Sequence, residues 1–191
     1  MGLKKILTVL VAVGALLTVS GCSVNSGGVA AVIDGQVLYE KDMLTTANDV
    51  TDILSADPSF ANFSSMNFVL QNAIYEAAMQ KAFGENQSPF TEDQHDQFWT
   101  TYYDPNSAVY QLWTDPRTRD NLTGYLDYNI VKLLESQGQD MTQVDAAIAQ
   151  VPVTVNPRYG SWDLSALALT SMLTSQGTGS LGNPQTFSLP A

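Results

Sequence analysis

The chain has 191 residues, of which 8 are basic and 19 are acidic, so its formal net charge is −11. Such an acidic chain is a poor ligand for nucleic acid, and it lacks the excess of lysine and arginine that forms a basic patch for anionic lipid headgroups. One cysteine and one histidine are too few for a structural metal site, so we expect no metal and no cofactor. The length suffices for one domain with its own core.

The first 21 residues have the features of a secretory signal peptide. Lys4 and Lys5 precede an uncharged apolar run over 6–19, which is shorter than the roughly 20 residues of a spanning helix. The run ends in Ser20-Gly21-Cys22, which resembles the lipobox of bacterial lipoproteins. The sequence therefore predicts a lipoprotein signal peptide over 1–21 and lipidation of Cys22, with the protein held at the extracytoplasmic side of the cell membrane. The alternative is a buried Cys22 thiol in an uncleaved anchor.

A β-hairpin is expected directly after a short tether. Residues 22–28 are small and polar after the cysteine and indicate a flexible linker. An apolar run over 29–33 and a second over 36–38 flank Asp34-Gly35, and Asp-Gly between apolar runs is typical of a type I′ hairpin turn.

The next part of the chain is predicted to be helical, and a late apolar strand follows at 151–155. Apolar periodicity, serine and threonine caps and the Asp115-Pro116 pair set the expected helix limits. Helices are expected over 40–54, from 64 or 65 to 83, and over 91–102, 107–113, 116–137 and 142–150. After Leu164 the chain turns polar, small and Gly-rich, as in SQGTGSLGNPQ (175–185), so we expect the domain to span 29–163 and the tail over 164–191 to be disordered.

Aromatic residues are dense in the second half of the helical region, and they leave two interpretations open. Their rings can line a groove that binds apolar peptide segments, or they can fill the core between helices. The candidate peptide-binding residues are Phe98, Trp99, Tyr102, Tyr110, Trp113 and Tyr125.

His95 is the single histidine, in the second turn of a predicted helix beside Asp93 and Asp96. It can be read as a metal ligand or base, or as a surface histidine in an acidic helix start. No second histidine at ligand spacing and no serine-nucleophile motif accompany it. We therefore expect a surface histidine, and a protein that is not an enzyme.

Two stretches together resemble the SurA N-terminal domain family of secreted chaperones. They are AAVIDGQVLYEKDM (30–43) and VTVNPRYGSWD (153–163). The resemblance implies that the hairpin pairs with the distant C-terminal strand, and that the helices between them enclose a cleft for unfolded polypeptide. It further implies a mainly α fold of five to six helices closed by a small β-sheet. Many relatives carry a parvulin-type prolyl isomerase module with two histidines, and this chain has neither the histidines nor the length for it.

The NPRYGSW segment can be a structural lock or a ligand site, and we favour the lock. Pro157 would end strand pairing, and Gly160 would permit a turn. Arg158 can pair with a carboxylate such as Asp34 or Asp163. The candidate lock residues are Asn156, Pro157, Arg158, Tyr159, Gly160 and Trp162.

The sequence thus predicts a non-catalytic, lipid-anchored chaperone-like protein that binds unfolded or extended segments of secreted polypeptides. The alternative is a structural or envelope-interaction lipoprotein that keeps this fold without binding clients. No sequence feature indicates the oligomeric state.

Overall fold

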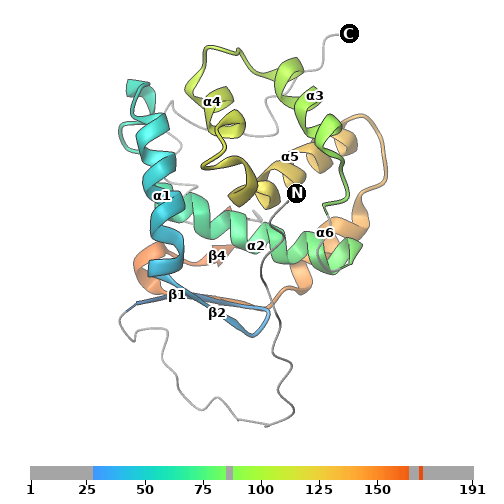
Figure 1. Cartoon of the computed structure of the whole chain (residues 1–191). Coiled ribbons are helices and arrows are strands. Elements are labelled where there is room, and N and C mark those ends of the chain that lie inside the picture. Colours follow the sequence, from blue (N-terminus) through green and yellow to red (C-terminus); the bar gives the residue numbers. More distant parts are fainter. Residues whose placement is uncertain (1–27, 85–87, 164–167, 170–191) are drawn as a thin grey trace, which may run out of the picture.

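A computed structural model of the chain describes residues 28–84, 88–163 and 168–169. These residues form the predicted mainly helical domain with a small antiparallel sheet (Figure 1). The predicted signal peptide, Cys22 and the tether up to residue 27 lie outside the described residues, as does all of the predicted tail except residues 168–169.

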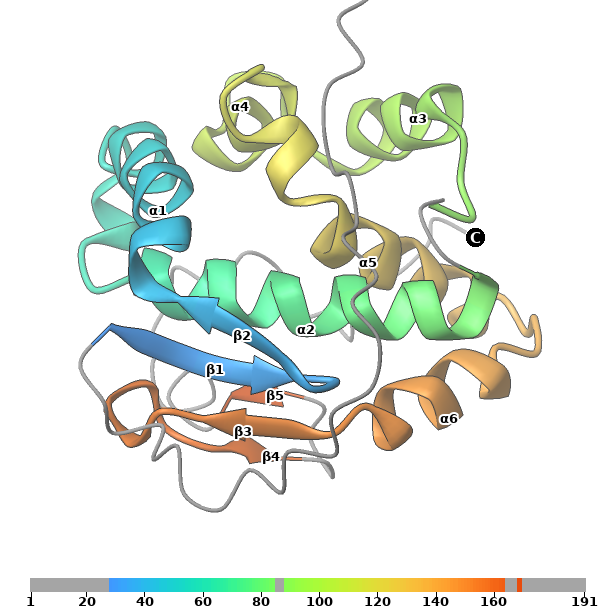
Figure 2. The ribbon, with the colours of Figure 1, turned by 60° about the horizontal axis from the view of Figure 1, so that its bottom comes forward.

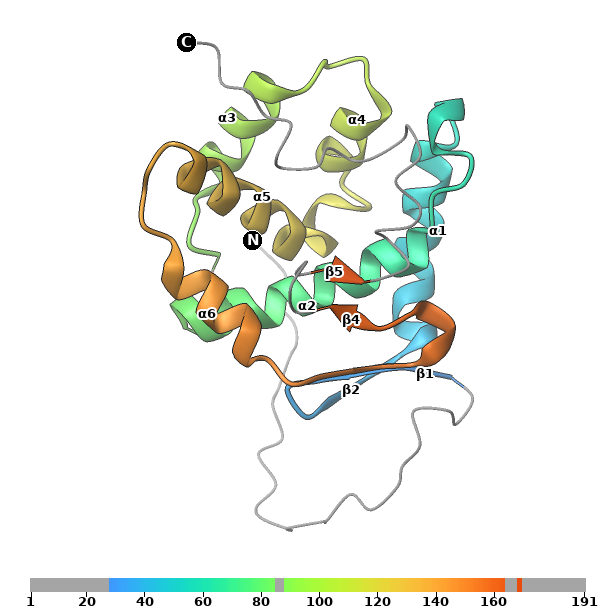
Figure 3. The same ribbon diagram turned by 180° about the vertical axis from the view of Figure 1, so that it is seen from behind.

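Helix α2 lies across the middle of the molecule, and the other helices are arranged around it (Figures 1 and 3). Five consecutive α2 residues, 68–72, are buried, because neighbours cover the helix on several sides. The six helices of the described residues are α1 (Glu40–Leu54), α2 (Ser65–Phe83), α3 (Glu92–Tyr102), α4 (Ala108–Thr114), α5 (Thr123–Ser136) and α6 (Thr142–Gln150).

Side-chain caps begin α2 and α3 where the sequence predicts. Ser64 accepts a hydrogen bond from the Asn67 amide at the start of α2. Thr91 and Gln94 form a reciprocal capping box at the start of α3, which satisfies two amides that the helix itself leaves unbonded. The apolar residues of α1 are buried except for Leu44, which is 47% exposed.

Helix α5 crosses α2 closely. A Cβ added at Gly124 would lie 2.5 Å from the Glu76 amide nitrogen and 2.7 Å from the Asn72 carbonyl oxygen. The Asn72 side chain joins the two helices further, because its Oδ1 accepts from the Tyr125 amide at 2.8 Å. Only glycine allows this approach of two backbones.

The expected helix start at Asp115-Pro116 is wrong. Asp115 ends α4, and its carboxylate accepts from the Arg117 amide and guanidinium. A 3-10 turn, Arg119–Asn121, follows before α5 begins. Asp-Pro suits a turn as well as a helix start, and here the bonds to Arg117 and the bond from the buried Thr118 hydroxyl to the Leu112 carbonyl favour the turn.

The predicted pairing of distant strands is confirmed. Strands β1 (Val29–Ile33), β2 (Gln36–Tyr39) and β3 (Val153–Val155) form an antiparallel sheet in the order β2-β1-β3 (Figure 2). Asp34 and Gly35 both have positive φ, 48° and 80°, as a type I′ turn requires. Strand β3 is shorter than predicted because Val151 still caps α6.

The segment after β3 forms the predicted lock, although with a different ion pair. The Asn156 amide donates to the Ala30 carbonyl at 2.9 Å, and its Nδ2 donates to the Val29 carbonyl at 2.8 Å. Pro157–Tyr159 then form a 3-10 turn that ends at Gly160, whose φ is 92°. These bonds hold the C-terminal segment against the start of β1.

Arg158 pairs with Glu40 at 2.6 Å, so the expected partners Asp34 and Asp163 are wrong. The Tyr159 hydroxyl donates to the same Glu40 carboxylate at 2.9 Å. Glu40 meets both groups because it begins α1 directly after β2, beside the lock.

A second, two-stranded sheet extends beyond the predicted domain end. Strand β4 (Trp162–Asp163) pairs antiparallel with β5 (Ala168–Leu169) near α2 (Figure 3). Trp162 packs edge-on against Tyr75 of α2, with ring centroids 6.1 Å apart. Residues 168–169 are therefore paired rather than disordered.

Candidate functional site

The centre of the predicted aromatic groove is core. Trp99 of α3 and Trp113 of α4 stack with centroids 4.6 Å apart at 8°, and each is 2% exposed. Tyr125 of α5 continues the stack beyond Trp113, at 6.1 Å and 17°. Rings this well covered stabilise the contact of three helices, and the two tryptophans offer almost no surface to a ligand.

The other predicted peptide-binding residues are covered in part. Phe98 is buried and contacts Tyr102 with centroids 5.2 Å apart. Tyr102, Tyr110 and Tyr125 are half-buried. None of the six predicted residues is fully exposed, so packing between helices accounts for most of this cluster.

A cavity of about 240 Å³ lies between α3 and α5, and Phe98 and Tyr102 are the two predicted residues that line it. Trp99, Tyr110, Trp113 and Tyr125 do not. The complete lining consists of Phe90, Gln94, Gln97, Phe98, Thr101, Tyr102, Ile130, Leu133 and Leu134.

The cavity lining contains no charged side chain. Apolar residues from both helices form most of it, and Gln94, Gln97 and Thr101 of α3 supply amide and hydroxyl groups. Pockets for small-molecule ligands occupy about 300–1,000 Å³. The smaller volume here suits one or two apolar side chains, with the polar groups of α3 beside them.

His95 is not the surface residue that the sequence predicts. It is 7% exposed, and its Nε2 donates to the Asp127 carboxylate at 2.8 Å. The residue lies three and four positions before Phe98 and Trp99, so it shares the buried face of α3. Asp127, 2% exposed on α5, also accepts from the Ser88 hydroxyl at 2.8 Å.

Ser88, His95 and Asp127 do not have the geometry of a catalytic triad. In a triad the carboxylate binds one ring nitrogen of histidine and the serine hydroxyl binds the other. Here the carboxylate and the hydroxyl both lie at Nε2, with the hydroxyl 3.4 Å from it. A nitrogen that donates to a carboxylate has no lone pair to accept the serine proton. The three groups instead join α3, α5 and the segment before α3 at one end of the cavity.

Burial and charge shift the pKa of several groups near this cluster. Glu76 keeps solvent contact, yet the protein around its carboxyl group and then the charge of Asp127 raise its pKa. Burial raises the pKa of Tyr125 to about 12, so its hydroxyl stays neutral at physiological pH. The rings of Tyr75 and Tyr128 stack on each other with centroids 4.0 Å apart, and burial raises the pKa of both hydroxyl groups.

Two features are absent from the described part of the chain: a metal-binding cluster and a membrane-spanning helix. No three acidic, histidine or cysteine side chains there lie close enough together to hold a metal ion. No helix there is both long enough and apolar enough to span a bilayer.

Comparison with known proteins found no match to the chain among family models, curated proteins or solved structures.

Sequence reasoning missed most of the cavity lining and both partners of His95. Ile130, Leu133 and Leu134 occupy neighbouring positions on α5, at the spacing typical of one apolar helix face. Helical periodicity therefore indicated one wall, but no local signal indicates that α3 is the opposite wall. Asp127 lies 32 residues after His95, in a stretch with no motif.

Proposed function

We propose that this protein is a lipid-anchored, chaperone-like protein that binds extended apolar segments of secreted polypeptides outside the cytoplasm, without catalysis. The observation that carries the proposal is the uncharged, mostly apolar cavity between α3 and α5. The secretory signal features and the lipobox-like Ser20-Gly21-Cys22 support the location. The resemblance of residues 30–43 and 153–163 to the SurA N-terminal domain family supports the class of client.

The proposed binding site is narrower than the aromatic groove expected from the sequence. Phe98 and Tyr102 lie at the cavity together with Ile130, Leu133 and Leu134. An apolar client side chain would enter between α3 and α5, and Gln94 or Gln97 would bond the client backbone beside it. Such a site binds many sequences weakly, because it recognises apolar character and an unpaired backbone.

Binding is tested with the mature protein and aromatic-rich peptides, by fluorescence anisotropy and by suppression of aggregation of an unfolded client. Thr101→Trp would fill the cavity from an exposed position on its wall, and Leu134→Asp would place a charge in it. Each is expected to weaken peptide binding by about tenfold, on the order of 1.4 kcal/mol. Leu44→Asp, at an exposed position on α1, is the control and should bind normally.

The alternative is a structural or envelope-interaction lipoprotein that binds no client. The observation that favours it is the burial of Trp99 and Trp113, which makes the aromatic cluster core rather than groove. If the unaltered protein neither binds peptide nor suppresses aggregation at micromolar concentration, or if Thr101→Trp binds as well as Leu44→Asp, the alternative replaces the chaperone-like proposal.

A further inference from the structure

The three-stranded sheet has one buried face and one open face. Ala31 and Ile33 of β1 point into the core and are buried. Val32 lies between them in the chain and therefore points the other way. Its partners are Val37 on β2 and Thr154 on β3, and directly paired residues share a face. We call Val32, Val37, Tyr39 and Thr154 the outer sheet face.

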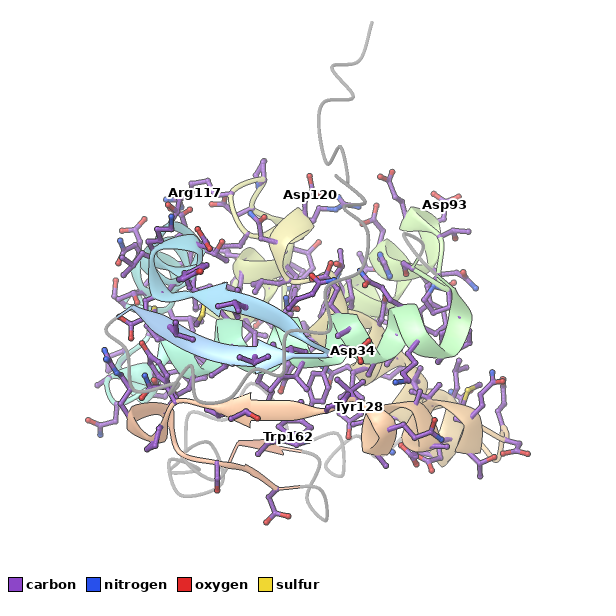
Figure 4. All side chains as sticks on the ribbon, turned by 90° about the horizontal axis from the view of Figure 1, so that it is seen from below. Asp34, Asp93, Arg117, Asp120, Tyr128 and Trp162 are labelled. Atoms are coloured by element: carbon purple, nitrogen blue, oxygen red, sulfur yellow. The ribbon has the colours of Figure 1, made fainter. Side chains whose placement is uncertain are left out.

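The outer sheet face is uncharged and partly apolar. Strands β1, β2 and β3 contain no Asp, Glu, Lys or Arg, in a chain of net charge −11. Val37 is 46% exposed and Tyr39 is 43% exposed, so two of the four large hydrophobic side chains that the described residues expose belong to this face. In Figure 4, which looks at the molecule from below, the three strands lie in front of the helices.

The same face lies where the chain leaves the domain toward its predicted lipid. Val29, the first residue of β1, is paired with Tyr39. Residues 23–28 separate it from Cys22, and the seven steps from one Cα to the next along this stretch reach at most about 25 Å. A lipid on Cys22 would therefore hold the start of β1, and the outer sheet face with it, close to the bilayer surface.

The rim of the face has the composition of a membrane–water boundary. The Lys41 ammonium lies 5.5 Å from the centre of the Tyr39 ring, and Arg158 borders the same end with its side chain half exposed. Tyrosine and long basic side chains suit this boundary because each has an apolar body and a polar tip. Glu40 and Asp42 balance the two cations, so apolar area rather than anionic lipid should dominate the contact.

We propose that the outer sheet face rests on the bilayer to which the chain is anchored, with Val37 and Tyr39 at the level of the headgroups. This inference relies on the proposed lipidation of Cys22. It gives the molecule a defined orientation, because the sheet and the α3 helix lie at opposite ends in Figure 1. The cavity between α3 and α5 then faces away from the membrane, toward polypeptides that have been exported.

The test uses the full lipidated protein in vesicles of phosphatidylethanolamine and phosphatidylglycerol. Mass spectrometry of the mature chain first establishes whether Cys22 carries lipid, and an unmodified Cys22 would overturn the proposed anchor itself. Val37→Cys and Thr154→Cys are then labelled with an environment-sensitive fluorophore. Thr100→Cys is the control, because Thr100 is an exposed residue of α3, at the opposite end of the molecule from the sheet.

We expect a headgroup-attached nitroxide lipid to quench the labels at 37 and 154 at least about twofold more strongly than the label at 100, as for an apolar face lying in the interface. The difference should persist in purely zwitterionic vesicles. Equal quenching at the three positions in a chain that does carry lipid would overturn the orientation and leave the anchor intact. A label at 37 that responds to an aromatic-rich peptide and not to vesicles would assign the face to a polypeptide instead.

Discussion

The sheet end and the α3–α5 end of this molecule differ in how far apart their contacting residues lie in the chain. At the sheet end, Asn156 bonds Val29 across 127 positions and Tyr159 bonds Glu40 across 119. At the other end, stacked rings and the His95–Asp127 pair join neighbouring helices, and that pair spans 32 positions. The sheet end is therefore closed by a few directional bonds between residues that are distant in the chain, whereas the α3–α5 end is stabilised by buried apolar volume.

Loss of apolar volume at the α3–α5 end should have the largest effect on stability. Trp113→Ala would leave a void beneath Trp99 and Phe68, whose rings both contact Trp113. We expect the free energy of unfolding to fall by about 3–5 kcal/mol, measured by urea denaturation. Tyr110→Ala, at a half-buried position on the same helix, should cost clearly less. Equal losses would contradict the assignment of Trp113 to the core.

Removal of the buried carboxylate at the same end should have the next largest effect. Asp127→Ala would leave the buried His95 ring and the Ser88 hydroxyl without their shared acceptor. The expected loss is about 2–3 kcal/mol, since unsatisfied buried polar groups are costly. Asp127→Asn keeps an acceptor oxygen and should lose less. Hydrogen exchange should increase in α3 and remain unchanged in β1. An increase confined to β1 would contradict the assignment of Asp127 to the α3–α5 end.

Asn156→Ala tests the sheet end. It removes the bond to the Val29 carbonyl and the acceptor for the Arg158 amide, both at a buried side chain. We expect a loss of about 1–2 kcal/mol, with faster hydrogen exchange in β1 and β3 but not in α3. Asn106→Ala is the control, because its exposed amide bonds only the nearby Asp104. If the two variants are equally stable, the lock does not stabilise the sheet.

The smallest effect should come from Glu76, and it should depend on pH. Because folding raises the pKa of this carboxyl group, the folded state binds its proton more tightly than the unfolded state. Stability is therefore highest below the unfolded pKa and falls as pH rises through the folded pKa. Glu76→Gln should be more stable than the parent at neutral pH by less than about 1 kcal/mol, given its solvent contact. The difference should vanish in acid; a variant that is less stable at neutral pH would contradict this sign.

Most of the fold could be predicted because its signals are local. The Asp34-Gly35 turn, the Ser64 cap and the Thr91 capping box each identify an element within a few residues. The helix start predicted at Asp115-Pro116 is wrong because Asp-Pro suits a turn as well as a helix start, and here the bonds from Arg117 to Asp115 favour the turn. The start of α5 depends on Gly124 meeting α2, which is a tertiary contact that no local pattern carries.

The candidate site could be predicted only in part, for the same reason. The sequence placed Phe98 and Trp99 in a cluster that is either groove or core, but it cannot show that one lines a cavity while the other stacks on Trp113. His95 looked exposed because its chain neighbours are acidic, and its burial follows from Asp127 on another helix. Which face of a buried ring remains accessible depends on the partner helix.

The pairing of β1 with β3 has a consequence for the order in which the chain becomes structured. Synthesis proceeds from the N-terminus, so the β1–β2 hairpin and the helices can form while Val153–Val155 are still absent. Until then β1 has an open edge, and closing a loop of this length costs on the order of 4 kcal/mol in chain entropy. The strand made first is therefore the last to be completed, and the unfinished chain must be protected at that edge until β3 is made.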